Sequence, residues 1–250
     1  MQTYAVVGSG YMGGGIAQVL ALSGASVAIA DVSGEVARGN LARLVDEARA
    51  FEADGLFPGG AADTIAQNLT AAESIEEAVL IEELATAVES PERFLGVHFS
   101  NPAPFIPGVE IIAHAGTQEQ SIVAAEHVVN ATGKLPARVS DATGFVLNRL
   151  QYALFHEATQ IVEEGIASAE DVDVIVRSTF GFRLPFFGPF AIADMAGLDV
   201  YALCYASLQT RWPERFATPA SLEQHVAAGR FGTKTGAGYL SIPAEQTPEL

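Results

Sequence analysis

The sequence predicts an α/β domain built on a mostly parallel sheet, followed by a domain made only of helices. Two observations support this division. Apolar runs typical of buried strands alternate with helical patterns over residues 1–140, which is the order of elements in a parallel α/β sheet. From Asp141 onwards the pattern is almost entirely helical. We therefore expect a sheet domain at residues 1–140 and a helical domain at residues 141–250.

The first strand, Tyr4–Val7, leads directly into Gly8-Ser9-Gly10-Tyr11-Met12-Gly13, and an apolar helical pattern follows. A second strand, Ser26–Ala30, ends at Asp31. This is the G-x-G-x-x-G fingerprint of a Rossmann unit, with an acidic residue about 20 positions further on. Gly8 permits the tight turn, Gly10 lets the backbone approach a pyrophosphate, and Gly13 lets the helix pack closely on the strand.

We expect this segment, including Tyr11 and Met12 at the start of the helix, to bind NAD. The helix N-terminus offers N–H groups and a positive dipole end to the phosphates. Asp31 can accept hydrogen bonds from both ribose hydroxyls, and its charge repels the 2′-phosphate of NADP. A glycine-rich helix start without a ligand is the alternative, but the order of strand, turn, helix, strand and acid favours the cofactor.

The remaining elements follow from hydrophobic periodicity. In the sheet domain we expect helices at 35–53, 61–79 and 119–132, and strands at 94–99, 109–113 and 135–139. In the helical domain we expect a long helix from Thr143-Gly144 to Glu164, then helices at 169–178, 190–210 and 219–229. Ser168 is a suitable cap for the second of these helices.

Composition narrows the class of protein. The chain has 250 residues, of which 49% are hydrophobic, so a substantial core is available. Its net charge of −17 argues against nucleic-acid binding, which needs a basic surface. We find no apolar run long enough for a membrane span and no basic signal region at the start. The single cysteine, Cys204, indicates a reducing compartment. We therefore expect a cytoplasmic protein that acts on a small molecule.

Polar residues stand where a sheet of this kind binds its ligands. His98-Phe99-Ser100-Asn101-Pro102 follows a predicted strand, and ligands bind at the carboxyl ends of such strands. Glu110 lies just inside the next strand, and Asn148 lies in the first turns of the long helix. Asn101 is either a substrate contact or a residue that only holds the turn before Pro102. His156-Glu157 lacks a second histidine at Gln160, so we expect no metal site.

Together with the glycine turn, these residues resemble the 3-hydroxyacyl-CoA dehydrogenase family over nearly the whole chain. Further similar segments are 141–146, 188–199 and 232–239. The resemblance implies that His98 is the general base, that Glu110 is its partner and that Asn148 touches the substrate. The chemistry is reasonable, because alcohol oxidation needs a base near neutral pH and a carboxylate fixes the imidazole tautomer.

The resemblance also implies a homodimer formed through the helical half. That half contains many aromatic residues for its size, and an exposed aromatic surface of this size often marks an interface. The aromatic residues are Phe180, Phe182, Phe186, Phe187, Phe190, Tyr201, Tyr205 and Trp212. The alternative is that these rings fill the core of the small domain itself.

The chain departs from the family near Val79–Leu80. The family normally places about two strands and a helix between the segment at 73–79 and the strand that begins near Phe94. Either residues are missing there, so that the Cα atoms of Val79 and Leu80 lie further apart than one peptide bond allows, or the deletion is genuine. We expect the first, because a sheet without its central strands leaves apolar faces bare. A genuine deletion favours a non-catalytic NAD-binding protein.

The substrate class stays open between CoA esters and free acids. Phe51–Pro58, near which family members that act on acyl-CoA often carry a lysine, has two acids and no cation, which suits the negative charge of CoA poorly. Relatives in the same superfamily include L-gulonate dehydrogenase and an enzyme that oxidises a formyl group on a pyridine carboxylate. Gly181–Phe187 is similar to the latter. Arg183 is either a partner for a substrate carboxylate or part of a surface salt bridge.

Overall fold

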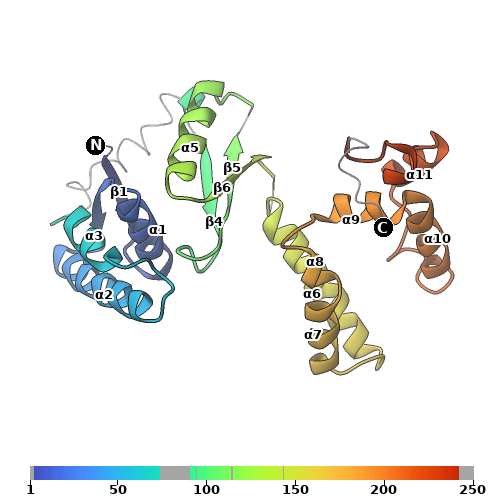
Figure 1. Ribbon diagram of the computed structural model, residues 1–250, viewed down its shortest axis with the longest axis horizontal. Helices are drawn as coiled ribbons and strands as arrows, with labels where there is room; N and C mark the ends of the chain where they lie inside the picture. The colour runs from blue at the N-terminus through green and yellow to red at the C-terminus, as the bar shows by residue number, and fades with distance from the viewer. Residues whose placement is uncertain (1–2, 74–90, 94, 114, 143, 242–250) are drawn as a thin grey trace. The chain divides into compact units, whose positions relative to one another are not determined.

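Figure 1 shows a computed structural model, which describes residues 3–73, 91–93, 95–113, 115–142 and 144–241. The chain divides into two compact units, residues 1–151 and 152–250. The predicted fold class, an α/β part followed by a helical part, is confirmed. The predicted boundary at residue 140 stays a prediction. The Val79–Leu80 junction lies outside the described residues.

The first unit begins with a parallel three-stranded sheet in the order β1-β2-β3. Its strands are β1 (Thr3–Val7), β2 (Ser26–Ala30) and β3 (Leu69–Ala71), and its helices are α1 (Tyr11–Leu22), α2 (Gly34–Ala53) and α3 (Ala61–Asn68). Figure 1 shows these helices gathered around the sheet. The core between them contains Val27, Ile29, Leu44 and Ile65, all of them fully buried. The predictions for β1, α1, β2 and α2 are confirmed.

The predicted helix over residues 61–79 is wrong from Leu69 to Glu73, and residues 74–79 lie outside the described residues. The helix ends at Asn68, and Leu69 takes up the extended conformation that begins β3. The Asn68 side chain donates a hydrogen bond to the carbonyl oxygen of Ala21 at 3.0 Å, which ties the end of α3 to the end of α1. Pairing of Leu69 with Val27 of β2 outweighs the local helical pattern.

A second sheet follows, in the order β4-β5-β6. It contains β4 (Gly96–Phe99), β5 (Gly108–Ala113) and β6 (Leu135–Ser140), and α5 (Glu119–Ala131) packs against β5 and β6. The β5–β6 pair is parallel, whereas β4 runs antiparallel to β5. Ile122 and Val129 of α5 bury Val109 and Ile111 of β5. The strands lie where they were predicted, with β4 beginning two residues later after the short turn Pro91–Arg93.

The helical region begins with α6 (Leu147–Glu163), which runs from the first unit into the second. It continues with α7 (Ala169–Ser178), α8 (Phe180–Arg183), α9 (Pro189–Ala196), α10 (Leu198–Gln209), α11 (Ala220–Ala227) and a 3-10 turn at Thr233–Thr235. The predicted helix at 190–210 is two helices, because the chain breaks at Gly197. Ser168 caps α7 by accepting from the N–H of Asp171, as predicted.

The second unit has a small core, formed by Ala193, Leu198 and Leu222. Neither α6 nor α7 contains a buried residue. In the part of the chain that the structure describes, no single helix is long and apolar enough to cross a membrane, and α9 and α10 meet that criterion only as a pair bent by 98°.

Candidate active site

The antiparallel pairing of β4 with β5 brings His98 and Glu110 face to face. The two residues are direct register partners, and His98 Nδ1 lies 2.7 Å from Glu110 Oε2. The contact brings together the two residues that the family resemblance pairs. With Nδ1–H donating to the carboxylate, the neutral ring presents Nε2 as its acceptor. The pair can therefore take up a proton at one nitrogen while the other holds the ring in place.

Glu110 also contacts the start of α6. Its second oxygen, Oε1, accepts from the backbone N–H groups of Val146 and Leu147, each at 2.9 Å. Burial acts to raise the pKa of Glu110, but the hydrogen bonds from His98, Leu147 and Val146 outweigh it, so the pKa lies below its usual value. The carboxylate is therefore ionised at neutral pH.

For the other residues predicted for this site, the structure gives a position and an exposure. Asn148 lies half-buried in the first turn of α6, next in sequence to the N–H groups that bind Glu110. Asn101 is exposed and precedes Pro102 through a cis peptide bond. Arg183 is exposed at the end of α8, in the other unit of the chain. Their contacts with a substrate stay predictions.

The glycine turn between β1 and α1 has the shape that a dinucleotide needs. A Cβ at Gly13 would lie 1.8 Å from the carbonyl oxygen of Gly8, so only glycine lets the helix pack this closely. A Cβ at Gly10 would meet no atom of the described residues within 4 Å. Gly10 is also the N-cap of α1 and supplies no side-chain cap to its N–H groups. These N–H groups suit the pyrophosphate of NAD, so the residues present fit this cofactor.

Asp31 stands at the end of β2 and contacts the glycine turn. Its Oδ2 accepts from the N–H of Ser9 at 2.8 Å and from the Ser9 hydroxyl at 2.7 Å, and its Oδ1 accepts from the N–H of Val32 at 2.8 Å. The Ser9 hydroxyl makes the largest contribution to lowering the pKa of Asp31. The carboxylate is therefore held ionised beside the turn where we expect the adenosine ribose to bind.

Sequence reasoning missed the residues that hold Asp31 and the turn. The Asn40 amide donates to the Ser9 hydroxyl at 2.8 Å, and the Arg43 guanidinium donates to the Ser9 carbonyl oxygen at 3.2 Å. Both residues belong to α2, far from the fingerprint in sequence. In the sequence, the one signal for these contacts is a serine inside the glycine turn. The structure shows that this serine is fully buried, and a buried hydroxyl needs hydrogen-bond partners.

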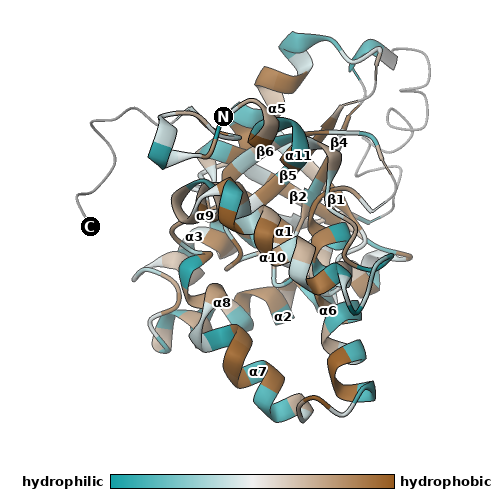
Figure 2. Ribbon diagram, turned by 90° about the vertical axis from the view of Figure 1, so that its right-hand side faces the viewer, coloured by the Kyte–Doolittle hydropathy of each residue, from teal (hydrophilic) through white to brown (hydrophobic). Residues whose placement is uncertain are grey.

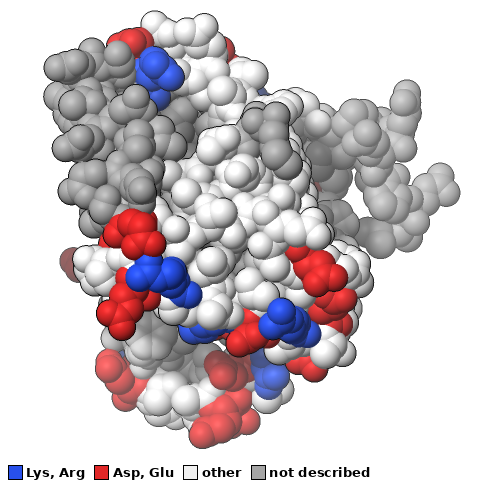
Figure 3. Space-filling view, turned by 90° about the vertical axis from the view of Figure 1, so that its left-hand side faces the viewer, with Lys and Arg blue, Asp and Glu red and all other residues white. Residues whose placement is uncertain are grey.

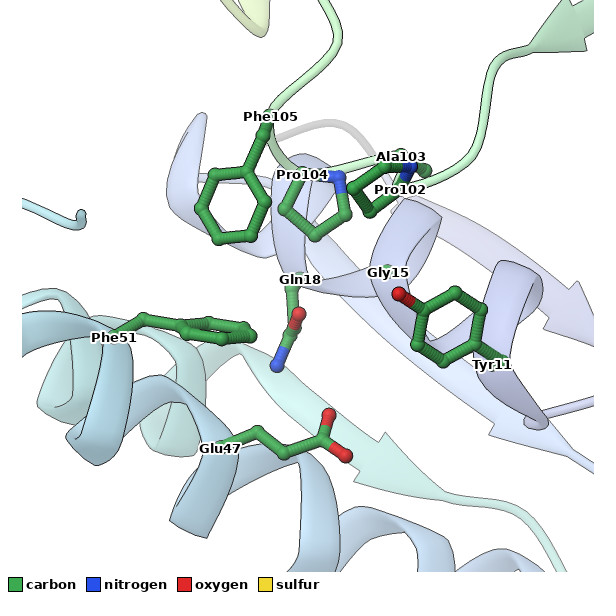
Figure 4. A pocket seen from close by; sticks show the side chains of 9 residues that line it. All are labelled: Tyr11, Gly15, Gln18, Glu47, Phe51, Pro102, Ala103, Pro104 and Phe105. Atoms are coloured by element: carbon green, nitrogen blue, oxygen red, sulfur yellow. The ribbon is translucent and has the colours of Figure 1, made fainter. Parts of the chain in front are cut away.

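The loop between β4 and β5 lies against α1 and α2. Pro104 lies over Gly15, and Phe105 meets Phe51 edge-on at 4.9 Å between ring centroids (Figure 4). The cavity left between these elements measures about 30 Å³, which is room for roughly one water molecule. The buried ammonium of Lys134 donates to the carbonyl oxygen of Ile106 at 2.7 Å and fixes the end of this loop.

Part of the stretch Phe51–Pro58, near which members of the family that act on acyl-CoA often carry a lysine, packs within the fold. Its Glu52 carboxylate accepts from the N–H groups of Gly60 and Ala62 at the start of α3. Phe51 and Phe57 pack against each other and against Phe105. Glu52, one of the two acids, therefore binds the start of α3. The stretch still contains no lysine or arginine that could bind the phosphates of CoA.

The arginines of α2 are all paired with carboxylates. Arg38 pairs with Glu73, Arg43 with Glu47 and Arg49 with Asp46. Figure 3 shows one face of the molecule, on which blue basic groups lie next to red acidic ones. Within the described residues, no group of three or more His, Cys, Asp or Glu side chains gathers in a way that could hold a metal ion.

The sequence is similar to known dehydrogenases over both halves of the chain. The sequence model for the NAD-binding domain of 3-hydroxyacyl-CoA dehydrogenase matches residues 3–80 and 77–142, and the model for the C-terminal domain of the same enzyme matches residues 144–241. The first of these models matches in two stretches that meet at residues 77–80, where the sequence departs from the family pattern.

Two curated relatives are informative. The 5-formyl-3-hydroxy-2-methylpyridine 4-carboxylate 5-dehydrogenase of Mesorhizobium japonicum is 36% identical over 171 residues, which is 68% of this chain and 55% of the relative. The 3-hydroxyadipyl-CoA dehydrogenase of Escherichia coli is 29% identical over 288 residues, with 98% of this chain and 60% of the relative covered. An alignment of 288 residues exceeds this chain of 250, so the relative carries residues that this chain lacks.

One solved structure shows the same fold. The 3-hydroxyacyl-CoA dehydrogenase of Archaeoglobus fulgidus superposes with a TM-score of 0.76 at 25% identity, and the match covers 97% of this chain and 93% of that one. By contrast, the matched region spans only 55% and 60% of the two curated relatives above.

Proposed function

Because the chain belongs to the 3-hydroxyacyl-CoA dehydrogenase family, we propose that it is an NAD-dependent dehydrogenase that oxidises a CH–OH group or a hydrated aldehyde. The observation that carries this proposal is the contact between His98 and Glu110, 2.7 Å apart on paired strands. In this role the two residues are a general base and the carboxylate that orients it.

The reaction needs a proton acceptor at the hydroxyl of the substrate. Nε2 of His98 takes that proton as the carbonyl forms, and Nδ1–H keeps its hydrogen bond to Glu110. The ionised carboxylate stabilises the imidazolium that results. NAD held at the glycine turn would supply the acceptor for the hydride that leaves the carbon atom bearing this hydroxyl. Asn101, which lies between the two residues in sequence, and Asn148, which follows them, position the substrate.

The cofactor is held by the glycine turn and by Asp31. The N–H groups at the start of α1 bind the pyrophosphate, while Gly8, Gly10 and Gly13 keep the backbone close to it. Tyr11 and Met12 form the first helical turn beside it. Asp31 binds the ribose hydroxyls and disfavours a 2′-phosphate, so NADP is a poor substitute.

The substrate is a hydroxyacyl-CoA ester or a free carboxylic acid, and three observations favour the free acid. The three arginines of α2 are already paired with carboxylates, and Phe51–Pro58 offers no cation to the phosphates of CoA. The first relative described above is named for its action on a pyridine carboxylate. In that case Arg183 binds the substrate carboxylate.

The experiment is an assay of NADH formation with a panel of 3-hydroxy acids, their CoA esters and pyridine aldehydes. Turnover of at least one panel member supports the proposal, and the preferred class decides between ester and acid. NAD binding without turnover of any member contradicts it. That result supports the alternative of a non-catalytic NAD-binding protein, which the interrupted match at residues 77–80 favours.

Two further properties belong to this proposal. The chain forms a homodimer through its helical half. The single cysteine, Cys204, is exposed and unpaired, which suits a reducing compartment such as the cytoplasm.

A further inference from the structure

The two oxygens of Glu110 bind different groups, and both sets of contacts affect the His98 base. One oxygen binds the His98 ring, and the other binds the N–H groups of Val146 and Leu147. We propose that these two N–H groups, at the start of α6, share the charge of Glu110 and so weaken the attraction of that carboxylate for a proton on His98, which leaves the ring able to act as a base. This inference rests on the proposed function and assigns a positioning role to residues 146 and 147.

The physical problem is that a carboxylate orients an imidazole but also stabilises its protonated form. A ring that already carries a proton cannot accept one from the substrate. Two N–H donors on the same carboxylate draw part of its negative charge away from the ring. The positive end of the α6 dipole, developed over 17 residues, acts in the same direction.

The chain makes these donors available by a specific turn. The first N–H groups of a helix have no partner within the helix, and Gly144 and Phe145 both take positive φ angles, 78° and 47°, just before α6 begins. A positive φ is strained for phenylalanine. The contact with Glu110 helps to hold this turn, and the Phe145 ring lies 5.4 Å from the His98 ring between centroids.

An arginine stands on each of two elements next to the pair, β6 and α6. On β6, Ala137 is the register partner of Glu110, and the neighbouring Arg138 is paired with Glu119 and Glu126. On α6, the Arg149 side chain packs beside Gly144. The variants proposed below leave all of these charges unchanged.

The test removes one donor and leaves the charge alone. Leu147→Pro deletes the N–H of residue 147 at the first helical position, where proline is well tolerated. The carbonyl oxygen of Val146 accepts from the N–H of Leu150, so the N–H of Leu147 lies in the first turn of α6 and has no partner inside the helix to lose. Leu147→Ala is the matched control, because it removes the side chain but keeps the N–H.

The measurement is a titration of the His98 ring by NMR in the whole protein without substrate, with the signal assigned by its loss in His98→Gln. We expect the midpoint to rise by about half a pH unit in Leu147→Pro and to stay in place in Leu147→Ala. Equal midpoints in the two variants would overturn the inference. If Leu147→Pro does not fold, replacement of the 147 amide by an ester removes the same N–H, and the same rise is expected.

The pH profile of kcat/KM provides a second readout. The acid limb moves to higher pH in Leu147→Pro, whereas a purely structural defect lowers the plateau and leaves the limb in place. The NMR titration needs no turnover, so it remains informative if the panel assay finds no substrate. An active enzyme whose His98 titration is the same in both variants would contradict the inference and leave the proposed function intact.

Discussion

At the scale of single residues, the carboxylate of Asp31 connects the cofactor site to the fold. Its contacts with Ser9 join the end of β2 to the turn after β1, and Asn40 and Arg43 hold Ser9 from α2. A ligand that binds Asp31 therefore meets a carboxylate whose orientation is already fixed, which reduces the entropy lost on binding.

Asp31→Ala should weaken NAD binding by about 1–3 kcal/mol, since the ribose loses a charged acceptor. NADP should lose less affinity than NAD, because the repulsion of its 2′-phosphate disappears as well. Isothermal titration with both cofactors measures this, with Asp46→Ala on the exposed face of α2 as the control. Unchanged NAD affinity, or equal binding of both cofactors by the unmodified protein, would show that Asp31 does not select the cofactor.

The pH dependence of NAD binding follows from the same contacts. Hydrogen bonds, first of all from the Ser9 hydroxyl, hold the pKa of Asp31 below its ordinary value of 3.8. A carboxylate with a lowered pKa keeps its charge as the pH falls, until the pH reaches that lowered value. We therefore expect the Kd for NAD to stay constant between about pH 8 and pH 5. A loss of affinity centred above pH 5, and absent in Asp31→Asn, would contradict this.

The sequence predicted some of these contacts and could not predict others. His98 and Glu110 could be proposed as neighbours from the family resemblance. Ser9 and Asn40 could not be paired, because their meeting depends on how α2 packs over the glycine turn. The N–H groups of Val146 and Leu147 carry no sequence signal at all, since every residue except proline has one.

At the scale of elements, a single buried carboxylate fixes the segment that follows α11. Asp194 of α9 is fully buried and accepts from the N–H groups of Tyr239 and Leu240 at 3.0 and 2.7 Å. A Cβ at Gly238 would lie 2.1 Å from Asp194 Oδ1, which explains the glycine in this motif. Asp194 therefore ties residues 238–240 back to α9.

Asp194→Asn should destabilise the protein by about 1.5–3 kcal/mol, because the new amide group faces an N–H donor and a charge-assisted hydrogen bond is lost. Asp199→Asn is the matched control, since it breaks the exposed pair with Lys234, and such a pair contributes about 0–1 kcal/mol. Urea unfolding followed by circular dichroism measures both. Equal losses in the two variants would mean that the Asp194 contacts contribute no more than a surface ion pair.

Helices and strands with strong periodicity were predicted correctly, and the errors have tertiary causes. The predicted helix ran beyond the end of α3 because no sequence pattern indicates that β3 pairs with β2. The antiparallel direction of β4 was equally hidden, since the same apolar run suits either direction. The break between α9 and α10 was missed because glycine inside a helical pattern is often tolerated.

At the scale of the whole molecule, the helical half exposes a large apolar surface. The phenylalanines Phe182, Phe186, Phe187 and Phe190 are 68%, 71%, 45% and 54% exposed, whereas Tyr201 and Tyr205 pack on the small core. Figure 2 shows hydrophobic segments alternating with hydrophilic ones along α7 and its neighbours. Exposed surface of this kind favours an interface over a self-contained core.

We therefore expect a homodimer through the helical half, measured by light scattering at micromolar concentration. Phe186→Ser together with Leu203→Ser should shift the protein towards a monomer, because both side chains are more than two-thirds exposed, at 71% and 72%. Leu56→Ser, which removes an exposed apolar group of the sheet half at 57% exposure, is the control. A monomeric parent protein would contradict the expectation.

His98 is the proposed base of the dehydrogenase. The most direct test is the single-turnover rate of NADH formation in NAD-saturated protein, with the substrate that the panel identifies. His98→Gln should slow this step about 10²- to 10⁴-fold while leaving NAD affinity unchanged, because only proton transfer is lost. Glu110→Gln should slow it in the same direction, and His127→Gln on the exposed face of α5 should have no effect. Full activity in His98→Gln would contradict the account.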